Sequence, residues 1–407
     1  MKEILSKVLL QIKPEKEDVH EVEDFIRALN KEIKAKKIKA KAAAGGSYAK
    51  NTWLAGDYDA DIFVKFNMKY ASEDLSKLLL RILKKYKPQK IHGSRDYYWI
   101  KNKLKFEIVP VLDINKKNQA QNVTDFSPLH VDWVNKKGRK FKDDIRIAKR
   151  FCKVIGCYGA ESFIHGFSGH VIDILVIYYK GFIPLLKASL KWKPKVIIDF
   201  SGKIGKKATF ILNKSKIQGP MIVIDPVQPN RNAAAALNLE MFERFKLNAK
   251  KFLKKPSIKF FEYSKINYSL LKKKGELVLI KVNVPKGKED PVGAKLLKAF
   301  EFIAKKLQHF DIKDKGWEWN RKSKAEFWYV LKNKKLPLYF ELAGPPVRMK
   351  EYLSKFKKKH KKTIIRKGRI YAKVKYKYRN IKNYLEKDVF THSYLKDKVK
   401  SCKLEKV

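Results

Sequence analysis

Two aspartates, Asp59 and Asp61, stand at the start of a run of β-branched and aromatic residues that ends at Phe66. Such a run is typical of a strand. Because alternate strand residues point to the same face, the two carboxylates lie close together and repel each other unless a cation sits between them. Oxygen ligands combined with a substrate phosphate suit Mg²⁺. The sequence therefore predicts a magnesium site at this pair.

A glycine-serine turn lies just upstream of these acids. Gly46 permits a close approach of the backbone, and Ser47 offers an N–H group and a hydroxyl group to a phosphate. Lys50 adds a positive charge. Each motif alone is common as a plain turn or as a solvated strand end. Together they have the arrangement that nucleotidyl transfer requires.

A second strand, predicted at residues 104–111, carries one acid, Glu107, within an apolar run. Burying this carboxylate without a partner would be costly. If the strand neighbours residues 60–66, Glu107 completes a site of three carboxylates. Otherwise it is a carboxylate at the rim that faces solvent or pairs with Lys105. Asp113 is the substitute for the third ligand.

Composition limits the class of protein. The chain has 407 residues, of which 44% are hydrophobic and 12% aromatic, enough for two to four folded domains. Its formal net charge of +53 favours a nucleic acid over a membrane as partner, although biased lysine usage would also give a plain solvated surface.

No stretch reaches the length of about 18 apolar residues that a membrane span needs. The N-terminus shows no signal-peptide pattern, and the cysteine spacing fits neither a zinc site nor a disulfide framework, so we expect a cytoplasmic protein.

Hydrophobic spacing predicts helices in the first two thirds of the chain, at residues 15–36, 72–86, 143–156, 170–180 and 233–245. Asp143 is the expected N-cap of the third helix, and Asn230 or Asn232 that of the last. Arg231 would then sit at a helix N-terminus, where the helix dipole disfavours a cation. An unfavourable position suggests a function, and a guanidinium can donate several hydrogen bonds in one plane. The alternative is an exposed arginine that extends into water.

Beyond residue 256 strands and helices are mixed, with strands predicted at 277–284, 317–319, 325–331 and 338–342 and helices at 292–307 and 349–358. Residues 344–347 are predicted to turn into the last helix. Further on, cations alternate with apolar and aromatic residues over 372–379. This alternation would present a row of cations to a phosphate backbone. The alternative is an edge strand that its lysines protect from aggregation.

The wording Gly-Ser-x-Ala-Lys-x-Thr-Trp-Leu-x-Gly-Asp at residues 46–57 resembles the archaeal-type (class I) CCA-adding tRNA nucleotidyltransferases of the polymerase-β-like superfamily. Tyr-Gly-Ala-Glu at 158–161, Gly-Phe-Ser-Gly at 166–169 and the region 226–237 are similar to further motifs of this family, and residues 127–134 resemble its Pro-Phe-His-x-x-Trp segment. The resemblance covers nearly the whole chain but is thin after residue 256. The family usually has Asp where this chain has Glu107.

The resemblance implies a multidomain α+β fold. Residues 1–135 would form a polymerase-β-like nucleotidyltransferase head with a mixed sheet and helices, 136–255 a mainly helical nucleotide-binding neck, and 256–407 an α+β body and tail that binds tRNA. The implied activity is template-independent addition of CCA to the 3′ end of tRNA from CTP and ATP, with two Mg²⁺ ions held by Asp59, Asp61 and Glu107. The implied nucleotide-binding residues are Gly46, Ser47, Lys50, His130, Lys149, Tyr158 and Arg231.

By residue type alone, three of these would have structural roles: His130 as a structural histidine, Lys149 as a surface charge and Tyr158 as a core ring. A poly(A)-polymerase-like or A-only terminal nucleotidyltransferase is the alternative enzyme, distinguished by whether it uses CTP and stops after three additions. A non-catalytic RNA-binding protein is the alternative from another class, and the two intact aspartates, Asp59 and Asp61, argue against it.

The acceptor stem and stacked arm of tRNA are expected to bind to the basic C-terminal half, which would recognise them by shape. The choice of Mg²⁺ over Mn²⁺ and the oligomeric state, a homodimer included, stay open.

Overall fold

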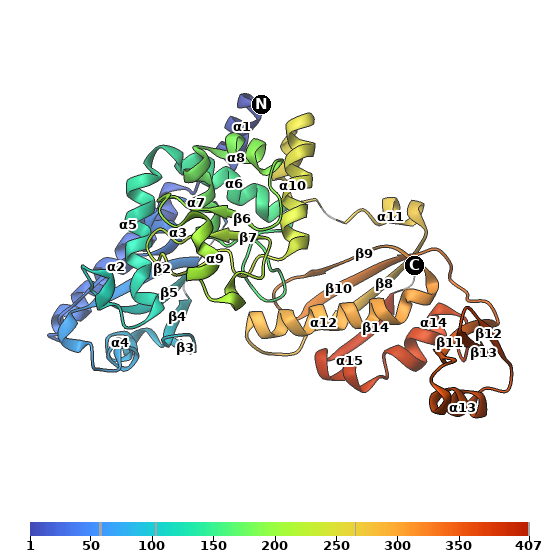
Figure 1. The fold of residues 1–407 in the computed structure, drawn as a ribbon. Helices are drawn as coiled ribbons and strands as arrows, with labels where there is room; N and C mark the ends of the chain where they lie inside the picture. Colours follow the sequence, from blue (N-terminus) through green and yellow to red (C-terminus); the bar gives the residue numbers. More distant parts are fainter. Residues whose placement is uncertain (57–58, 102–103, 265, 406–407) are drawn as a thin grey trace. The chain divides into compact units, whose positions relative to one another are not determined.

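The computed structural model covers the whole chain, and the described residues are 1–56, 59–101, 104–264 and 266–405. Asp57, the last residue of the glycine-serine motif, lies outside them. The chain divides into two compact units, Met1–Ser264 and Lys265–Val407, which are described separately (Figure 1).

The first unit contains a five-stranded mixed sheet with the strand order β1-β2-β5-β4-β3 (Figure 1). The strands are β1 (Ala40–Ala44), β2 (Asp59–Phe66), β3 (Gln89–Ile91), β4 (Tyr97–Lys101) and β5 (Lys105–Leu112). The central neighbours β2 and β5 run parallel, and the other pairs are antiparallel. The predicted strands at 60–66 and 104–111 are therefore neighbours in the sheet.

Alternation along β2 separates a core face from a polar face. Ala60, Ile62, Val64 and Phe66 are fully buried, and they belong to one core with the apolar sides of helices α2 (Lys16–Ala35) and α4 (Leu75–Leu83). Because successive strand residues point to opposite faces, the acids of β2 project from the face that these helices leave uncovered.

Helices form the rest of the first unit around a second core rich in phenylalanine. They are α1 (Lys2–Ile12), α5 (Ser127–Lys137), α6 (Lys142–Val154), α7 (Gly169–Tyr179), α8 (Phe182–Ser189) and α10 (Leu239–Lys254), with the short α3 (Gly46–Ala49) and α9 (Ala208–Ile211). A parallel pair, β6 (Val196–Ile198) and β7 (Met221–Val223), lies beside them. In α7 every residue from Val171 to Ile177 is buried, Asp173 included.

Two details of this region differ from the prediction. The predicted helix at 233–245 begins only at Leu239, where Asn238 caps it by accepting a hydrogen bond from the N–H of Met241. The Asn232 side chain accepts from the N–H groups of Val223 and Ala234, both at 2.9 Å, and such local side-chain bonds compete with helix formation. Asp143 lies in the first turn of α6, whose N-cap is Phe141.

The second unit contains a four-stranded antiparallel sheet with the order β14-β8-β10-β9, along which α12 (Glu289–Leu307) lies (Figure 1). The strands are β8 (Glu276–Asn283), β9 (Ile312–Trp319), β10 (Lys324–Leu331) and β14 (Ser401–Glu405). The remaining helices here are α11 (Tyr268–Lys274), α14 (Ile381–Tyr384) and α15 (Ser393–Lys398).

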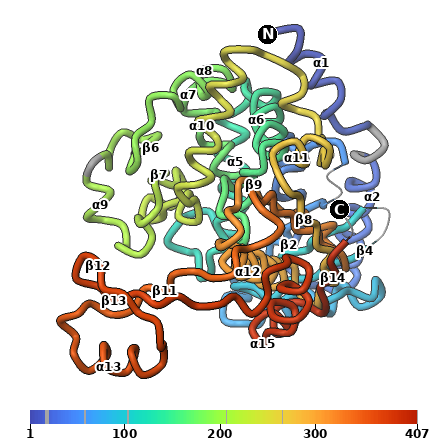
Figure 2. The backbone as a smooth tube through the Cα atoms, turned by 90° about the vertical axis from the view of Figure 1, so that its right-hand side faces the viewer, coloured from blue at the N-terminus to red at the C-terminus, as the bar shows by residue number. Residues whose placement is uncertain are grey.

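A smaller sheet of this unit has the order β11-β13-β12 and lies with α13 (Lys350–Lys359), as Figure 2 shows. Its strands are β11 (Tyr339–Pro346), β12 (Thr363–Arg366) and β13 (Arg369–Lys375). The lysine-rich strand β13 is central, so the edge-strand interpretation is wrong. The predicted turn at 344–347 begins only at Val347, because β11 runs through Pro346. Within the described part of the chain, no helix has the length and hydropathy that crossing a membrane requires.

Candidate active site

The sheet register brings two predicted acids together. Asp61 on β2 is the direct partner of Glu107 on β5, and Asp59 is the partner of Lys105. Lys105 Nζ lies 2.8 Å from Asp59 Oδ1, so this lysine pairs with Asp59, whose side chain is 66% exposed. Glu107 Oε2 instead accepts a hydrogen bond from Trp99 Nε1 at 3.0 Å. Glu107 therefore lies beside Asp61 on the uncovered face of the sheet.

Asp113, the alternative third ligand, follows the far end of β5. It lines a different cavity, with Lys65 and Asp132. It is therefore separate from the face where Asp61 and Glu107 meet.

Burial and neighbouring carboxylates raise the pKa values of both adjacent acids. Burial, together with the charges of Glu107 and Asp59, raises the pKa of Asp61 to about 7. Burial also raises the pKa of Glu107, against the opposing effects of the Trp99 hydrogen bond and of Lys105. Next to them, burial and the same acids raise the pKa of Tyr97 to about 12. Like charges at such a site favour either a shared proton or a bound cation.

Replacing Asp61 with asparagine is therefore expected to stabilise the metal-free protein at pH 8. The folded-state pKa of Asp61, about 7, lies above the ordinary value of 3.8, so the folded protein loses stability as pH rises between these values. At pH 8 the ionised Asp61 carboxylate therefore destabilises the fold. We expect the free energy of unfolding to increase by an amount on the order of 2 kcal/mol. This is about half of the energy that corresponds to the pKa shift, because Asp61 is only half-buried and solvent screens its charge. Hydrogen exchange of the β2 and β5 amides, in a chelator, measures it.

The matched control is Asp59→Asn, two positions along the same strand. Its carboxylate is exposed and paired with Lys105, and surface ion pairs are worth about 0–1 kcal/mol. We expect a small loss of stability in this variant. Equal gains in both variants would show that Asp61 carries no special electrostatic cost.

Gly46 lies directly against the Asp61 carboxylate. Its φ is +50°, and a Cβ atom built there would lie 1.6 Å from Asp61 Oδ2. Only glycine fits this position, because any side chain would collide with the acid and the backbone conformation is strained for other residues. Ser47 follows in α3, and its carbonyl oxygen accepts from the N–H of Thr52 at 2.9 Å. The glycine-serine turn and the acids thus form one local structure.

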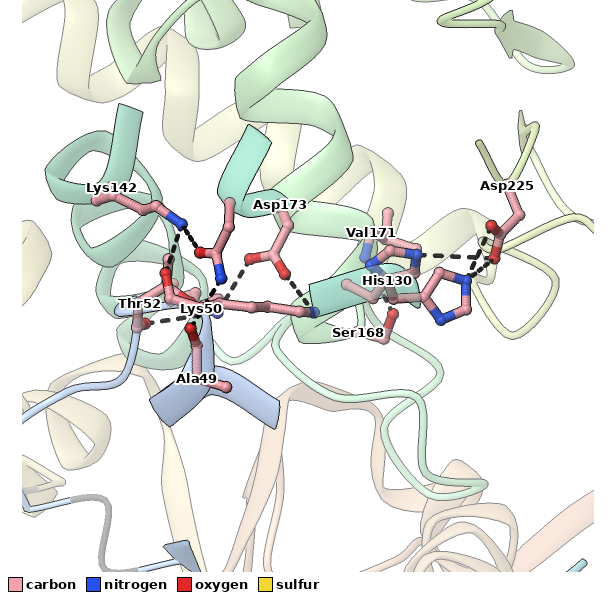
Figure 3. Close-up of polar contacts among 12 residues, drawn as sticks. Ala49, Lys50, Thr52, His130, Lys142, Ser168, Val171, Asp173 and Asp225 are labelled. Atoms are coloured by element: carbon pink, nitrogen blue, oxygen red, sulfur yellow. Dashed lines mark hydrogen bonds and ion pairs between the residues drawn. The ribbon is translucent and has the colours of Figure 1, made fainter. Parts of the chain in front are cut away.

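Two predicted phosphate ligands, Lys50 and Lys149, meet on a carboxylate that the sequence analysis did not assign to the site. Lys50 Nζ lies 2.9 Å from Asp173 Oδ2, and Lys149 Nζ lies 3.0 Å from Asp173 Oδ1 (Figure 3). Lys149 also donates to Thr52 Oγ1 at 2.9 Å. All three charged side chains are buried. Burial alone would raise the pKa of Asp173, but Lys149 and Lys50 outweigh it and hold this pKa below its ordinary range.

A second buried carboxylate, Asp225, contacts further residues of the site. His130 Nε2 lies 3.0 Å from both of its oxygens (Figure 3). Arg231 Nη1 lies 3.1 Å from Oδ2. His170 Nε2 lies 3.6 Å from the same oxygen. Burial would raise the pKa of Asp225, but the hydrogen bonds with His130 and the nearby His170 ring outweigh it and keep this pKa far below its ordinary range.

Arg231 lies outside any helix, because α10 begins only at Leu239. The argument from the helix dipole is therefore wrong for this residue. Its position is explained by the ion pair with Asp225, and its side chain is still 45% exposed.

One cavity of about 380 Å³ connects these groups. Of the predicted site residues, it is lined by Gly46, Lys50, Asp61, Glu107, His130 and Arg231. Asp59, Ser47, Lys149 and Tyr158 do not line it. The Tyr158 hydroxyl lies near Gly169, since a Cβ there would be 2.9 Å from it and 3.8 Å from Lys149 Cε. Tyr158 and Lys149 therefore lie together behind the cavity wall.

Four residues of this site were not predicted from the sequence, namely Arg95, His170, Asp173 and Asp225. Asp173 carried a signal, since it is one acid in an otherwise apolar helix. Arg95 carried none: it donates to Thr124 Oγ1 at 3.2 Å and pairs with the buried Asp125, thereby joining two loops at the cavity rim. His170 and Asp225 lie next to motifs that the sequence analysis identified, but their convergence depends on the fold.

Paired acids on neighbouring strands of a mixed sheet, with a glycine turn against them, define a nucleotidyltransferase. Residues 26–152 match the nucleotidyltransferase domain family, 143–262 the second domain of tRNA nucleotidyltransferases, and 274–403 the C-terminal domain of CCA-adding enzymes. A solved structure of a cytoplasmic RNA terminal U-transferase has a TM-score of 0.51 at 13% identity, covering 65% of this chain and 100% of that one. At that identity the likeness shows the fold alone.

Curated relatives are more specific. The CCA-adding enzyme of Nanoarchaeum equitans is 38% identical over 336 residues, covering 81% of this chain and 82% of the relative. That of Methanocaldococcus jannaschii is 30% identical over 407 residues, covering 94% and 89%. The chain belongs to the CCA-adding enzyme family, which confirms the resemblance found in the sequence and the predicted α+β fold.

Proposed function

We propose that this protein adds C, C and A to the 3′ end of tRNA without a template, from CTP and ATP. The observation that carries the proposal is the register of Asp61 against Glu107, with Gly46 beside them, at the wall of the cavity. Membership of the CCA-adding family supports this activity over that of an A-only transferase or a non-catalytic RNA-binding protein.

A divalent metal ion fits the acidic pair. The pKa values of both carboxylates are raised, and these ligands are oxygens, which suit Mg²⁺. We assign Asp61 and Glu107 as ligands, with Asp59 joining them when it leaves Lys105, and we infer two Mg²⁺ ions. When bound, such ions lower the pKa of an attacking hydroxyl and neutralise charge on the transferring phosphate.

The residues of the chain itself would bind and orient the nucleotide. The Gly46–Ser47 turn offers backbone and hydroxyl donors beside the acids. Lys50, Lys149 and Asp173 together carry one net positive charge next to the cavity, and in a buried setting this charge attracts a triphosphate. Because Lys50 lines the cavity, it is the member of this trio that we expect to contact phosphate directly.

The other cavity wall would hold the rest of the nucleotide. His130 is held in place by Asp225 and would contact the triphosphate. Arg231, partly exposed, would reach the base, and Tyr158 would support Lys149 from behind the wall. Excluding water from this cavity on binding would strengthen all of these contacts.

The experiment that tests the function uses tRNA lacking its 3′ CCA. With CTP alone we expect addition of two residues, with ATP alone none, and with both a product three nucleotides longer. A product that grows without stopping on ATP alone would instead identify a poly(A)-polymerase-like enzyme. No extension under any condition would leave an RNA-binding protein.

Binding of tRNA is expected to weaken steeply with salt. The net charge is +53, and each phosphate contact releases counterions. We expect affinity to fall by about 1000-fold between roughly 50 and 200 mM salt, the range for six or more contacts. Filter binding at several salt concentrations gives the slope.

A pair of variants locates part of this surface. Lys373 and Lys375 are exposed on β13, and replacing both with glutamine should lower the salt slope by about two. The control replaces Lys31 and Lys34, which are exposed on α2, with glutamine. This variant loses the same amount of positive charge as the β13 variant. Equal effects of the two pairs would mean that net charge alone, not the β13 surface, determines binding.

A further inference from the structure

Two imidazoles that line the cavity converge with the buried carboxylate of Asp225. One ligand atom each from His130, His170 and Asp225 lies within 4.8 Å of the others. His130 and His170 Nε2 approach the Asp225 carboxylate to 3.0 and 3.6 Å. The three residues come from α5, from the first turn of α7 and from the segment after β7, so the fold alone creates this cluster.

The hydrogen bonds around this cluster hold Asp225 in place and leave the ring nitrogens of His170 available to bind an ion. Asp225 Oδ1 accepts from the N–H groups of Val227 and Gln228 at 2.9 and 3.0 Å, which fixes the carboxylate beside the two histidines. Both ring nitrogens of His170 are buried, and among the described residues neither has a hydrogen-bond partner. A buried polar atom of this kind calls for an explanation, such as a bound ion.

The chemistry of the donors selects the ion. Two imidazole nitrogens and one carboxylate oxygen suit Zn²⁺ and related transition metals, whereas Mg²⁺ prefers oxygen ligands only. Bonds of about 2.0–2.1 Å in tetrahedral geometry place ligand atoms about 3.3 Å apart, between the two distances found here.

We propose that His130, His170 and Asp225 bind a transition-metal ion of the Zn²⁺ class, with the fourth coordination position open to the cavity. Arg231 now lies 3.1 Å from Asp225 Oδ2 and would have to turn away, which its 45% exposure allows. His130 and Arg231 are also nucleotide ligands under the proposed function. Resting on that function, we infer that the bound ion and the nucleotide exclude each other, and that the site is inhibitory.

Binding is tested with Co²⁺ on the full-length chain. Tetrahedral Co²⁺ held by nitrogen and oxygen gives strong visible d–d bands, and Zn²⁺ added afterwards should abolish them. We expect one saturable site that His170→Asn weakens by about 100-fold or more. Asp61→Asn should retain it, because the acidic pair is a different site.

The matched control is His165→Asn, a histidine outside the cluster whose φ of +54° asparagine accepts readily. It should bind Co²⁺ as the unchanged protein does. Absence of the visible bands, equal loss in His165→Asn and His170→Asn, or the near-ultraviolet charge-transfer band of a thiolate ligand would each overturn the site. Asp225→Asn is the second test if His170→Asn fails to fold.

Inhibition is measured separately, with free Zn²⁺ buffered at fixed Mg²⁺, CTP and ATP. Zn²⁺ should slow CCA addition by the unchanged enzyme, and His170→Asn should need about 100-fold more Zn²⁺ for the same fractional loss. Co²⁺ binding without any CCA addition would refute the proposed function but keep the metal site. CCA addition without Co²⁺ binding would refute only the metal site, and binding without inhibition would refute the mutual exclusion.

Discussion

Asp61→Asn is expected to slow nucleotide addition by about 1000-fold while leaving tRNA affinity nearly unchanged. Asparagine keeps the size of the side chain but cannot carry the negative charge that, beside Glu107, would hold a divalent cation. Losing metal-ion stabilisation of several kcal/mol corresponds to a factor of this size in rate. Asp61 lines the cavity and is not part of a basic surface, so tRNA binding should persist. Single-turnover incorporation of CMP and filter binding measure the two effects.

The control for this prediction is Asp113→Asn. Asp113 follows the same strand as Glu107 but lines another cavity, so its loss should change the rate by less than about twofold. If Asp61→Asn retained its activity, or if Asp113→Asn lost it, the assignment of the acidic pair would be wrong. The expected rise in stability of Asp61→Asn, together with loss of activity, separates a functional defect from unfolding.

The three acids of the site, Asp59, Asp61 and Glu107, could be predicted because the sequence signals for them are local. A period of two places Asp59 and Asp61 on one face, and one acid in the apolar run of β5 requires a polar neighbour. The two requirements together imply that the strands lie side by side, which the parallel register shows. In the C-terminal unit the periodicities predicted β8 to β11, α12 and α13, but not β14, α11 or α15, and β11 runs on to Pro346, into the predicted turn.

The partners of the charged residues could not be predicted. Lys50 and Asp173 lie far apart in the sequence, and nothing near either residue indicates that they meet. Arg231 was predicted to lie at the N-terminus of a helix that begins only at Leu239, since the side chain of Asn232 bonds to β7 and to the loop instead of capping. Such long-range pairs depend on how α6 and α7 pack, which periodicity does not determine.

Asp173→Asn is the change expected to cost the most stability. Asparagine fits the space of the carboxylate but leaves Lys50 and Lys149, both buried, without a counter-charge. Removing one partner of a buried ion pair costs about 3–5 kcal/mol. Because the pKa of Asp173 is held low, its contribution is fully present at neutral pH and is lost only as pH falls below the ordinary range of an aspartate. Hydrogen exchange of the α7 amides at pH 7 reports this loss in the first unit.

A second substitution tests the cause. Adding Lys50→Met to Asp173→Asn removes one unpaired cation, so the double variant should recover about 1–2 kcal/mol, whereas independent effects would add. The matched control is Glu240→Gln, which breaks an exposed ion pair with Arg244 in the same unit and should cost at most about 1 kcal/mol. A loss in Asp173→Asn no larger than in this control would mean that water reaches both lysines. The net positive charge beside the cavity would then be too well screened to attract a triphosphate.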